Sequence, residues 1–413
     1  MTRRVKGACA IGAALLGWAL SACTLAPMKP VTLDSQLQAM MSETEVPGLA
    51  VALIRDGRLV FSKAYGLADR ERGEPLKTDT VMAGASLTKA AFAYLVLQLV
   101  DEGVINLDRP LPQQLRLPLH LYEDYADLAD DPRWREITPR MLLSHSSGLL
   151  NWRWINPDRK LTLNFRPGQR YVYSGEGIQL LQLIVEERTR EPLAALMQKR
   201  VFDRFGMVNT SLVWRDDFAS HAANTYAVDG TPRGHAQRRE ARAAGSMDTT
   251  LNDYAAFLAG VLRGDGLSAT SKQQMLSAQI AIISPQQFPS HWPGETTVNR
   301  GIALSAGLGW VVYQSPRGQA FFKEGSDEGT NNFALGFASS GDGVLMLSNS
   351  GNADKLFHEA AELLLGPPVT CLPWFWMGYI PLDRPALRRP GARDKPLGPS
   401  CVAETQEPEG SRR

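Results

Sequence analysis

The sequence predicts an α+β fold in which an antiparallel sheet is flanked by terminal helices and a mostly helical region is inserted. Short runs with the composition of strands occur near the start of the chain, at 48–69, and return from Gly307 onward. Residues 104 to about 265 carry helical and turn patterns instead. Strands at both ends of the chain can form one sheet while the helical region folds beside it.

A helix, a hairpin and a buried helix are expected in that order in the first part. LDSQLQAMMSET at 33–44 has the pattern of an amphipathic helix. Within 48–69, two β-rich runs flank Asp56-Gly57, which is a strong signal for a hairpin turn. TKAAFAYLVLQLVDEG is apolar nearly all round, and this predicts a buried helix that ends at Gly103.

Four strands and a closing helix are expected after Gly307. The strand-like runs are LGWVVYQ, QAFFKEG, NNFALGFAS and GVLMLSN, and the helix is ADKLFHEAAELLLG. These elements complete one domain, 33–366. The extension 367–413 becomes rich in Pro, Arg and Gly, so we expect it to be partly disordered. Its aromatic stretch, 374–379, is expected to pack on the body of the domain rather than to enter a membrane.

Composition limits the partners of the protein. The chain has 413 residues, of which 44% are hydrophobic, and this is enough for a sizeable core. A formal net charge of +1 gives no electrostatic footprint for nucleic acid, so no nucleic-acid partner is expected. The cysteines and histidines show no spacing typical of a metal site. A metal is therefore not expected, and the chemistry inferred below needs no other cofactor.

The N-terminus has the pattern of a targeting segment, 1–22. Three basic residues lie within the first six, and the apolar stretch that follows is too short for a comfortable membrane span. It ends in LSAC, which resembles the bacterial lipobox and implies cleavage before Cys23 and lipidation of that residue. Residues 23–32 would then form a tether, and Thr24 favours the outer membrane facing the periplasm. A plain signal peptide with an incidental cysteine is the alternative.

Two cysteines remain after this processing. Cys9 leaves with the targeting segment and Cys23 carries lipid, so Cys371 and Cys401 are left in the mature chain. The expected compartment permits disulfides, and no third cysteine competes for pairing. A disulfide between Cys371 and Cys401 and a pair of free thiols are both open.

The stretch GASLTKA contains a candidate nucleophile and base. Ser86 and Lys89 are three positions apart at the start of the buried helix, so they share one face. Apolar surroundings and the positive end of the helix dipole both disfavour an ammonium, which would leave a neutral lysine able to accept a proton. The alternative is that both are ordinary residues on a helix surface.

Seven segments resemble the serine β-lactamase and penicillin-binding-protein superfamily, and the branch of class C β-lactamases, D-Ala-D-Ala peptidases and family VIII esterases in particular. The resemblance runs from about residue 47 to about residue 366. In chain order, the segments are VPGLAVALIRDG, MAGASLTKAAFAYLVLQLVDEGVINLDRPL, ITPRMLLSHSSGL, FRPGQRYVYSGEGIQLLQLIVEERT, VFDRFGMVNTSL, AGSMDTTLNDYAAFL, and GLGW with FFKEGSDEGTNNF. It implies a β-lactamase/transpeptidase-like fold.

The resemblance implies roles for three side chains. Ser86 would be the nucleophile, Lys89 the general base, and Tyr173 the residue that relays a proton to the leaving group. A core tyrosine is the alternative for Tyr173. His145 lies in a stretch that is structural in the family, so we expect a buried, hydrogen-bonded histidine rather than a base.

The third family motif falls on FFKEG. Lys323 and Gly325 would lie on a strand beside the pocket, and the backbone N–H groups of Ser86 and Ser326 would form the oxyanion hole. The alternative for Lys323 is a surface lysine on an edge strand, where lysine is favoured for other reasons.

Two positions depart from the family pattern. Gly175 stands where a Tyr-x-Asn motif has asparagine, and this removes a side-chain amide that would bind an acylamide substrate. Glu324 replaces the usual Thr or Gly, and it brings negative charge where many relatives accept a carboxylate. Both departures weaken a β-lactamase interpretation and leave the acyl-transfer residues in place.

The sequence therefore predicts a lipid-anchored periplasmic serine hydrolase that forms an acyl-enzyme at Ser86, with an esterase or amide hydrolase preferred. Its partners would be a small ester, an amide or a peptidoglycan-like substrate, and the membrane through the N-terminal lipid. A D-Ala-D-Ala carboxypeptidase or endopeptidase and a weak β-lactamase are alternatives. A catalytically silent binding lipoprotein is an alternative from another class.

Overall fold

A computed structural model describes residues 32–289, 294–366 and 376–379 of the chain. The expected targeting segment and lipidation site at Cys23 lie outside these residues, as do Cys371 and Cys401. Lipidation and the disulfide therefore stay predictions. Within the described ranges, none of the helices is long and apolar enough to span a membrane.

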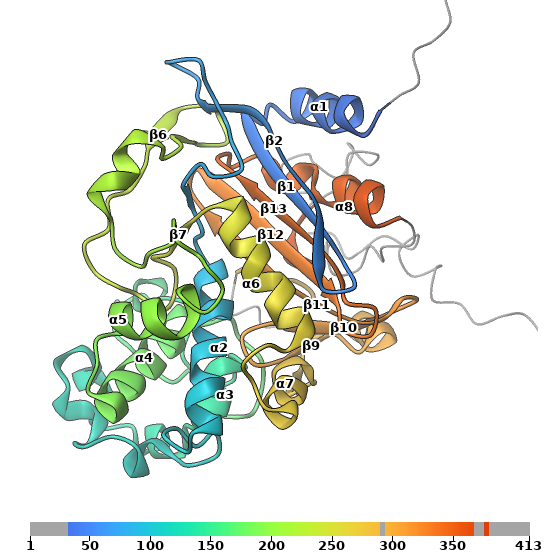
Figure 1. Cartoon of the computed structure of the whole chain (residues 1–413). Coiled ribbons are helices and arrows are strands. Elements are labelled where there is room, and N and C mark those ends of the chain that lie inside the picture. The colour runs from blue at the N-terminus through green and yellow to red at the C-terminus, as the bar shows by residue number, and fades with distance from the viewer. Residues whose placement is uncertain (1–31, 290–293, 367–375, 380–413) are drawn as a thin grey trace, which may run out of the picture.

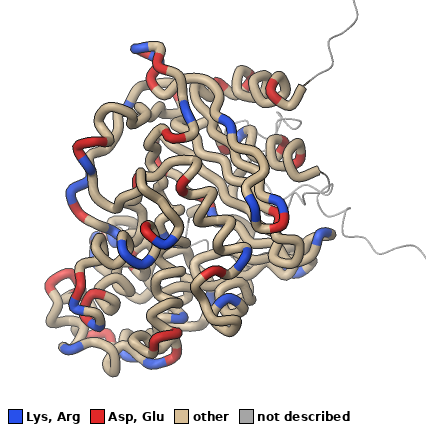
Figure 2. The backbone as a smooth tube through the Cα atoms, in the orientation of Figure 1, with Lys and Arg blue, Asp and Glu red and all other residues tan. Residues whose placement is uncertain are grey.

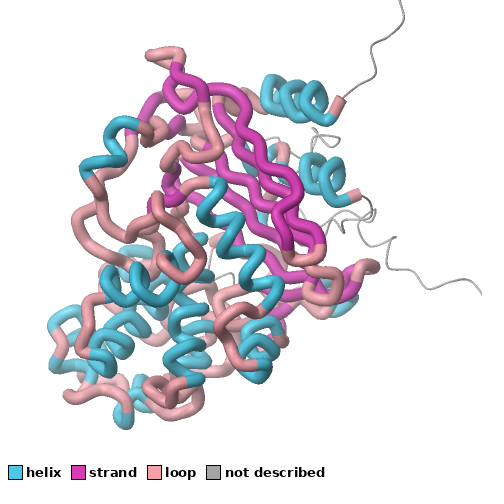
Figure 3. The backbone as a smooth tube through the Cα atoms, viewed as in Figure 1, coloured by secondary structure: helices cyan, strands magenta, loops and turns pink. Residues whose placement is uncertain are grey.

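A nine-stranded antiparallel sheet forms the centre of the molecule (Figures 1 and 3), in the order β3-β2-β1-β13-β12-β11-β10-β9-β8. Strands from both ends of the chain meet in it, because β1 pairs with β13. This confirms the predicted antiparallel α+β fold. The strands of this sheet are β1 (Gly48–Arg55), β2 (Arg58–Asp69), β3 (Glu74–Pro75), β8 (Ile280–Ala281), β9 (Ser305–Ala306), β10 (Val311–Ser315), β11 (Gly318–Asp327), β12 (Thr330–Phe337) and β13 (Asp342–Ser348).

Both faces of the sheet are buried, and alternate residues of a strand enter different cores. In β1, Leu49 and Val51 pack into one hydrophobic cluster, whereas Ala50 and Ala52 pack into the other. This alternation follows from the two-residue period of a strand. The first cluster is covered by the two terminal helices, α1 (Leu33–Glu43) and α8 (Phe357–Leu365). The last of these helices was predicted at 353–366. In the structure it begins later, at Phe357, after a short 3₁₀ turn.

The second face carries the buried helix and the inserted region. The remaining helices are α2 (Leu87–Asp101), α3 (Pro139–Leu143), α4 (Gly175–Thr189), α5 (Leu193–Met197), α6 (Leu251–Arg263) and α7 (Ala269–Leu276). The α2 helix is buried over nearly its whole length, as its apolar sequence predicts. Gly103 follows it with φ 73°, a conformation that suits a glycine after a helix.

The inserted region is less uniformly helical than the sequence suggests. Three short strands occur in it: β5 (Thr225–Tyr226), β6 (Pro232–Gly234) and β7 (Asp248–Thr249), the last paired with β4 (Met82–Ala83). The α6 helix lies across the sheet (Figure 1) and contacts β1, β2, β12 and β13. Its apolar side, with Tyr254, Phe257 and Leu258 fully buried, requires this position.

Charged residues of both signs are interspersed along the tube in Figure 2.

The described part of the aromatic stretch packs on the body of the domain, as predicted. Trp376 is fully buried, lies beside Tyr171 with ring centroids 5.9 Å apart, and donates from Nε1 to Ser284 Oγ at 3.3 Å. The Trp376 carbonyl accepts a hydrogen bond of 2.8 Å from the backbone N–H of Gln287. The stretch therefore supports a loop beside the cavity described below.

We expect Trp376→Ala to lower the free energy of unfolding by about 3–5 kcal/mol, because it deletes a large buried side chain. Chemical denaturation of the purified protein measures this change. Trp154→Ala is the matched control: this tryptophan is 59% exposed and stacks on Trp152, so its loss should cost no more than about 1.5 kcal/mol. Equal losses for the two variants would show that Trp376 is not a core residue.

Candidate active site

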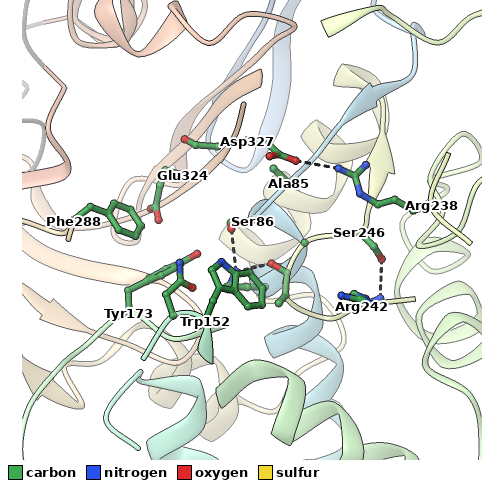
Figure 4. A pocket seen from close by; sticks show the side chains of 15 residues that line it. Ala85, Ser86, Trp152, Tyr173, Arg238, Arg242, Ser246, Phe288, Glu324 and Asp327 are labelled. Carbon is green, nitrogen blue, oxygen red and sulfur yellow. Dashed lines mark hydrogen bonds and ion pairs between the residues drawn. The ribbon is translucent and has the colours of Figure 1, made fainter. Parts of the chain in front are cut away.

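A cavity of about 260 Å³ opens between β11 and the start of α2. Figure 4 shows Ser86 near its centre. Residues from segments far apart in the sequence line it: Ala85, Ser86, Lys89, Asn151, Trp152, Tyr173, Arg238, Arg242, Ala244, Gly245, Ser246, Phe288, Glu324, Ser326 and Asp327. Ser86, Lys89, Tyr173 and Ser326 were predicted from the sequence, and the structure brings these four together.

The backbone presents Ser86 at a sharp turn. Ala85 has φ 45°, a left-handed conformation that costs an alanine about 1–2 kcal/mol. Ser86 then occupies the first position before α2, and its hydroxyl makes no capping hydrogen bond to the helix. The hydroxyl is therefore available to the cavity while the rest of the helix stays buried.

Lys89 lies one turn further along α2 and contacts Ser86 directly. Its Nζ is 3.0 Å from Ser86 Oγ and 2.5 Å from the carbonyl oxygen of Ala244, and the residue is 1% exposed. Burial lowers the pKa of Lys89, and the positive charge of Lys323 adds to this, while Tyr173 opposes it. A neutral Lys89 amine at 3.0 Å could accept the Ser86 proton. This geometry does not fit a pair of ordinary surface residues.

Tyr173 lies close to two lysines. Its ring centroid is 5.0 Å from Lys89 Nζ and 5.1 Å from Lys323 Nζ, and Lys323 Nζ approaches Tyr173 Oη at 3.4 Å. Burial alone would raise the pKa of Tyr173, but the positive charge of Lys323, with that of Lys89 when it is protonated, outweighs burial and holds this pKa below its usual value. Tyr173 is as buried as a core tyrosine, yet its hydroxyl belongs to the polar cluster at Ser86.

Lys323 is not an edge-strand surface lysine, so that alternative was wrong. It lies on β11, which is paired on both sides, and it is 2% exposed. Its Nζ donates at 2.8 Å both to the backbone carbonyl and to Oε1 of Glu324. Burial alone would lower the pKa of Lys323, but the Glu324 carboxylate and Tyr173 outweigh this and raise it. Lys323 therefore keeps a positive charge beside Tyr173.

Gly325 allows β11 to approach the start of α2. A Cβ at this position would lie 2.5 Å from the carbonyl oxygen of Gly84 and 3.0 Å from the backbone nitrogen of Leu87. Only a glycine fits this contact without a shift of the backbone. The close approach places Ser86 and Ser326 on the same cavity. The oxyanion hole formed by their two N–H groups stays a prediction.

His145 has the structural environment that the sequence predicts. It is 6% exposed, and its Nδ1 accepts a hydrogen bond from the backbone N–H of Ser174 at 3.2 Å. Its ring packs on Tyr173 with centroids 4.6 Å apart. Burial, together with the charges of Lys89 and Lys323, lowers the pKa of His145 well below its usual value. The neutral imidazole supports the Tyr173 segment instead of acting on Ser86.

The space that a side chain at position 175 would need is occupied by other residues. A Cβ there would lie 2.7 Å from the ring of Trp152 and 2.9 Å from the carbonyl oxygen of Asn151. The side-chain Oδ1 of Asn151 accepts from the backbone N–H of Gly175 at 2.9 Å. An asparagine introduced at Gly175 would therefore displace Trp152. No side-chain amide can be added there without a second change.

Sequence reasoning missed several residues of the cavity wall, among them Trp152, Phe288, Arg238 and Asp327. All except Asp327 lie on irregular segments, and nothing in their spacing indicates a shared site. Arg238 Nη2 pairs with Asp327 Oδ2 at 3.2 Å (Figure 4). Among the residues that the structure describes, no group of His, Cys, Asp or Glu is arranged to hold a metal ion.

A serine, a buried lysine and a buried tyrosine at the meeting point of a sheet and a helix define a serine hydrolase. The chain belongs to the β-lactamase family, because the model of that family matches residues 33–366. It is 27% identical to lovastatin esterase of Penicillium rubens over 339 residues, which cover 72% of this chain and 80% of the esterase.

Two further similarities agree with this assignment. Penicillin-binding protein 4 of Amycolatopsis lactamdurans is 25% identical over 396 residues, which cover 91% of this chain and 97% of that protein. The octameric penicillin-binding protein homologue from Pyrococcus abyssi is similar with a TM-score of 0.65 and 22% identity, over 81% of this chain and 77% of that chain. This second likeness concerns the fold.

We expect Lys323→Met to move the acidic limb of the pH profile of kcat/KM to higher pH. The positive charge of Lys323 lowers the pKa values of both Lys89 and Tyr173, so its removal raises both. A base works only when it is unprotonated, and higher pKa values therefore require higher pH. Hydrolysis of p-nitrophenyl butyrate measures the profile.

Lys63→Met serves as the control, because Lys63 is a half-exposed partner of Asp34 outside the cavity. Lys63→Met should leave the acidic limb of the pH profile unchanged. An acidic limb that is unchanged, or displaced to lower pH, in Lys323→Met would contradict the electrostatic role of Lys323. Thermal unfolding across the same pH range separates this effect from a loss of structure.

Proposed function

We propose that the protein hydrolyses carboxylic esters through an acyl-enzyme on Ser86. The observation that carries this proposal is the 3.0 Å contact between Ser86 Oγ and Lys89 Nζ, in surroundings that lower the pKa of the lysine. Ser86 Oγ attacks the ester carbonyl carbon as its proton passes to the neutral amine of Lys89. The carbonyl π electrons move to oxygen, and an anionic tetrahedral intermediate forms.

Tyr173 is placed to finish the first half of the reaction. The intermediate collapses, the bond to the alcohol oxygen breaks, and Tyr173 Oη supplies the proton that the departing oxygen needs. A proton then returns to Tyr173 Oη from Lys89, whose Nζ lies 5.0 Å from the centroid of the tyrosine ring. Water then attacks the acyl-enzyme with the same groups in reverse order, and the acid and Ser86 are released.

The walls of the cavity support an ester substrate over an acylamide. Trp152 takes the space beside Gly175, where a side-chain amide would have to stand to bind an acylamide group. Phe288 packs edge to face on Tyr173 with centroids 5.5 Å apart. These aromatic walls offer apolar contact to an acyl chain. The similarity to an esterase supports the same preference.

A lipid anchor is the second part of the proposal and rests on the sequence alone. The LSAC motif before Thr24 supports cleavage at Cys23 and attachment of acyl chains there, with the domain held at the outer membrane and facing the periplasm. Several acyl chains hold a protein firmly where one would not. A catalytically silent lipoprotein has no support from a site in which Ser86, Lys89 and Tyr173 stand in contact.

We expect Ser86→Ala to abolish covalent labelling by a fluorophosphonate and to reduce kcat/KM for p-nitrophenyl butyrate by more than about 10³-fold. The fold should survive, because the Ser86 hydroxyl makes no capping bond in α2. In the wild-type protein, the ester should be hydrolysed at least about tenfold better than a cephalosporin, because Gly175 offers no side-chain amide to the acylamide.

Ser246→Ala is the matched control for labelling. Ser246 lines the same cavity, but its hydroxyl donates to the Leu212 carbonyl at 2.8 Å and accepts from the backbone N–H of Arg242 at 2.8 Å. This variant should keep the label. If Ser86→Ala is labelled like the wild type, the nucleophile is another residue. Efficient cephalosporin turnover without ester hydrolysis would replace the esterase proposal with a β-lactamase.

We expect Cys23→Ser to prevent incorporation of labelled palmitate, because the substituted residue has no thiol to acylate. Radiolabelled palmitate supplied to cells that express the full chain measures this. Cys9→Ser is the control and should leave incorporation intact, since that residue lies in the segment removed by processing. Palmitate that persists in Cys23→Ser would contradict the lipobox interpretation.

A further inference from the structure

One buried acceptor, on a residue that lines the cavity, has no partner among the described residues. Glu324 is 5% exposed and lines the cavity. Its Oε1 accepts from Lys323 Nζ at 2.8 Å and from Gln287 Nε2 at 2.7 Å. Its Oε2 is buried and has no hydrogen-bond partner in the part of the chain that the structure describes. Both donors thus serve one oxygen, and the other is left buried and unpaired.

An unpaired buried carboxylate oxygen is costly. Buried polar groups in folded proteins are nearly always hydrogen-bonded, and an exception in a cavity indicates a ligand or a catalytic role. The reaction proposed above assigns no step to Glu324. Lys323 and Gln287 fix the carboxyl group in place, so Oε2 is held rigidly as an acceptor.

The position of Glu324 places this acceptor on the leaving-group side. Tyr173 protonates the departing alcohol, so the alcohol must lie at Tyr173 Oη. Lys323 Nζ contacts both Tyr173 Oη, at 3.4 Å, and Glu324 Oε1, at 2.8 Å, so the carboxylate adjoins the same side. Figure 4 shows Glu324 and Tyr173 on the same side of Ser86.

We propose that Glu324 Oε2 binds a hydrogen-bond donor on the alcohol part of the substrate, and that a protonated amine fits it best. The substrate class is then an ester of an amino alcohol. A charge-assisted hydrogen bond is about twice as strong as a neutral one, which favours an ammonium over a hydroxyl. A carboxylate on the leaving group would meet a like charge at Glu324 and is disfavoured. This inference rests on the proposed esterase function.

Three butyrate esters with leaving groups of nearly equal size test the proposal. They carry 2-(dimethylamino)ethyl, 3-methylbutyl and 2-carboxyethyl groups, which are cationic, neutral and anionic at pH 7. The wild type should prefer the cationic ester to the neutral one by about tenfold or more in kcat/KM, and the anionic ester should be the poorest.

Glu324→Gln is the decisive variant, because its amide oxygen keeps an acceptor for Lys323 and Gln287. The cationic-to-neutral ratio should fall by about tenfold or more, and the intrinsic reactivity of the esters cancels in this comparison. Asp327→Asn is the matched control. Asp327 also lines the cavity but its side chain is 58% exposed, so solvent screening should limit its effect on the ratio to about twofold.

Inhibition of the wild type covers the case in which Glu324→Gln does not fold. The free alcohol 2-(dimethylamino)ethanol should bind about tenfold or more tightly than 3-methylbutanol as a competitive inhibitor. An equal ratio in wild type and Glu324→Gln, or equal inhibition by the two alcohols, would overturn the assignment. Ser86-dependent hydrolysis of the neutral ester without a cation preference would leave the esterase function standing. No hydrolysis of any ester would refute the esterase function, and protection of Ser86 from fluorophosphonate labelling by the two alcohols then decides the acceptor.

Discussion

Two lysines are held out of water beside one tyrosine ring, and the cavity is built around them. A buried ammonium is unfavourable unless it is paired or gives up its proton. The two lysines meet this constraint in different ways. Lys323 is paired with Glu324 and keeps its charge, whereas burial lowers the pKa of Lys89. Lys323 thus supplies a fixed electrostatic field, and Lys89 supplies a base.

This division depends on how closely a strand and a helix approach each other. Gly325 has no side chain, so β11 comes against the start of α2. Lys323 on the strand and Lys89 on the helix then face the same ring of Tyr173. A wider gap would admit water, and water would weaken the field of Lys323 on its neighbours. The close approach allowed by Gly325 and the charge of Lys323 therefore act together on Lys89 and Tyr173.

The sequence was sufficient to predict the six longer strands, the buried helix and the pair Ser86 and Lys89. Their signals are local: periodic apolar residues, a turn at Asp56-Gly57, and a serine three positions before a lysine. Tyr173 was predicted through the family resemblance. Trp152, Phe288 and Gln287 could not be predicted, because they reach the site through loops whose paths are set by tertiary contacts. The short strands β5, β6 and β7 escaped prediction for the same reason, since two or three residues carry no readable period.

The pairing of β1 with β13 also has a consequence for the order in which the molecule is assembled. Ser86 belongs to the first quarter of the chain, but the wall that faces it is β11, which is held between β10 and β12. Leu49 of β1 lies opposite Ser348 of β13, so the sheet closes only when almost the whole domain is available. Contacts this distant in sequence form slowly. A growing chain therefore carries its serine for most of its synthesis without a cavity around it.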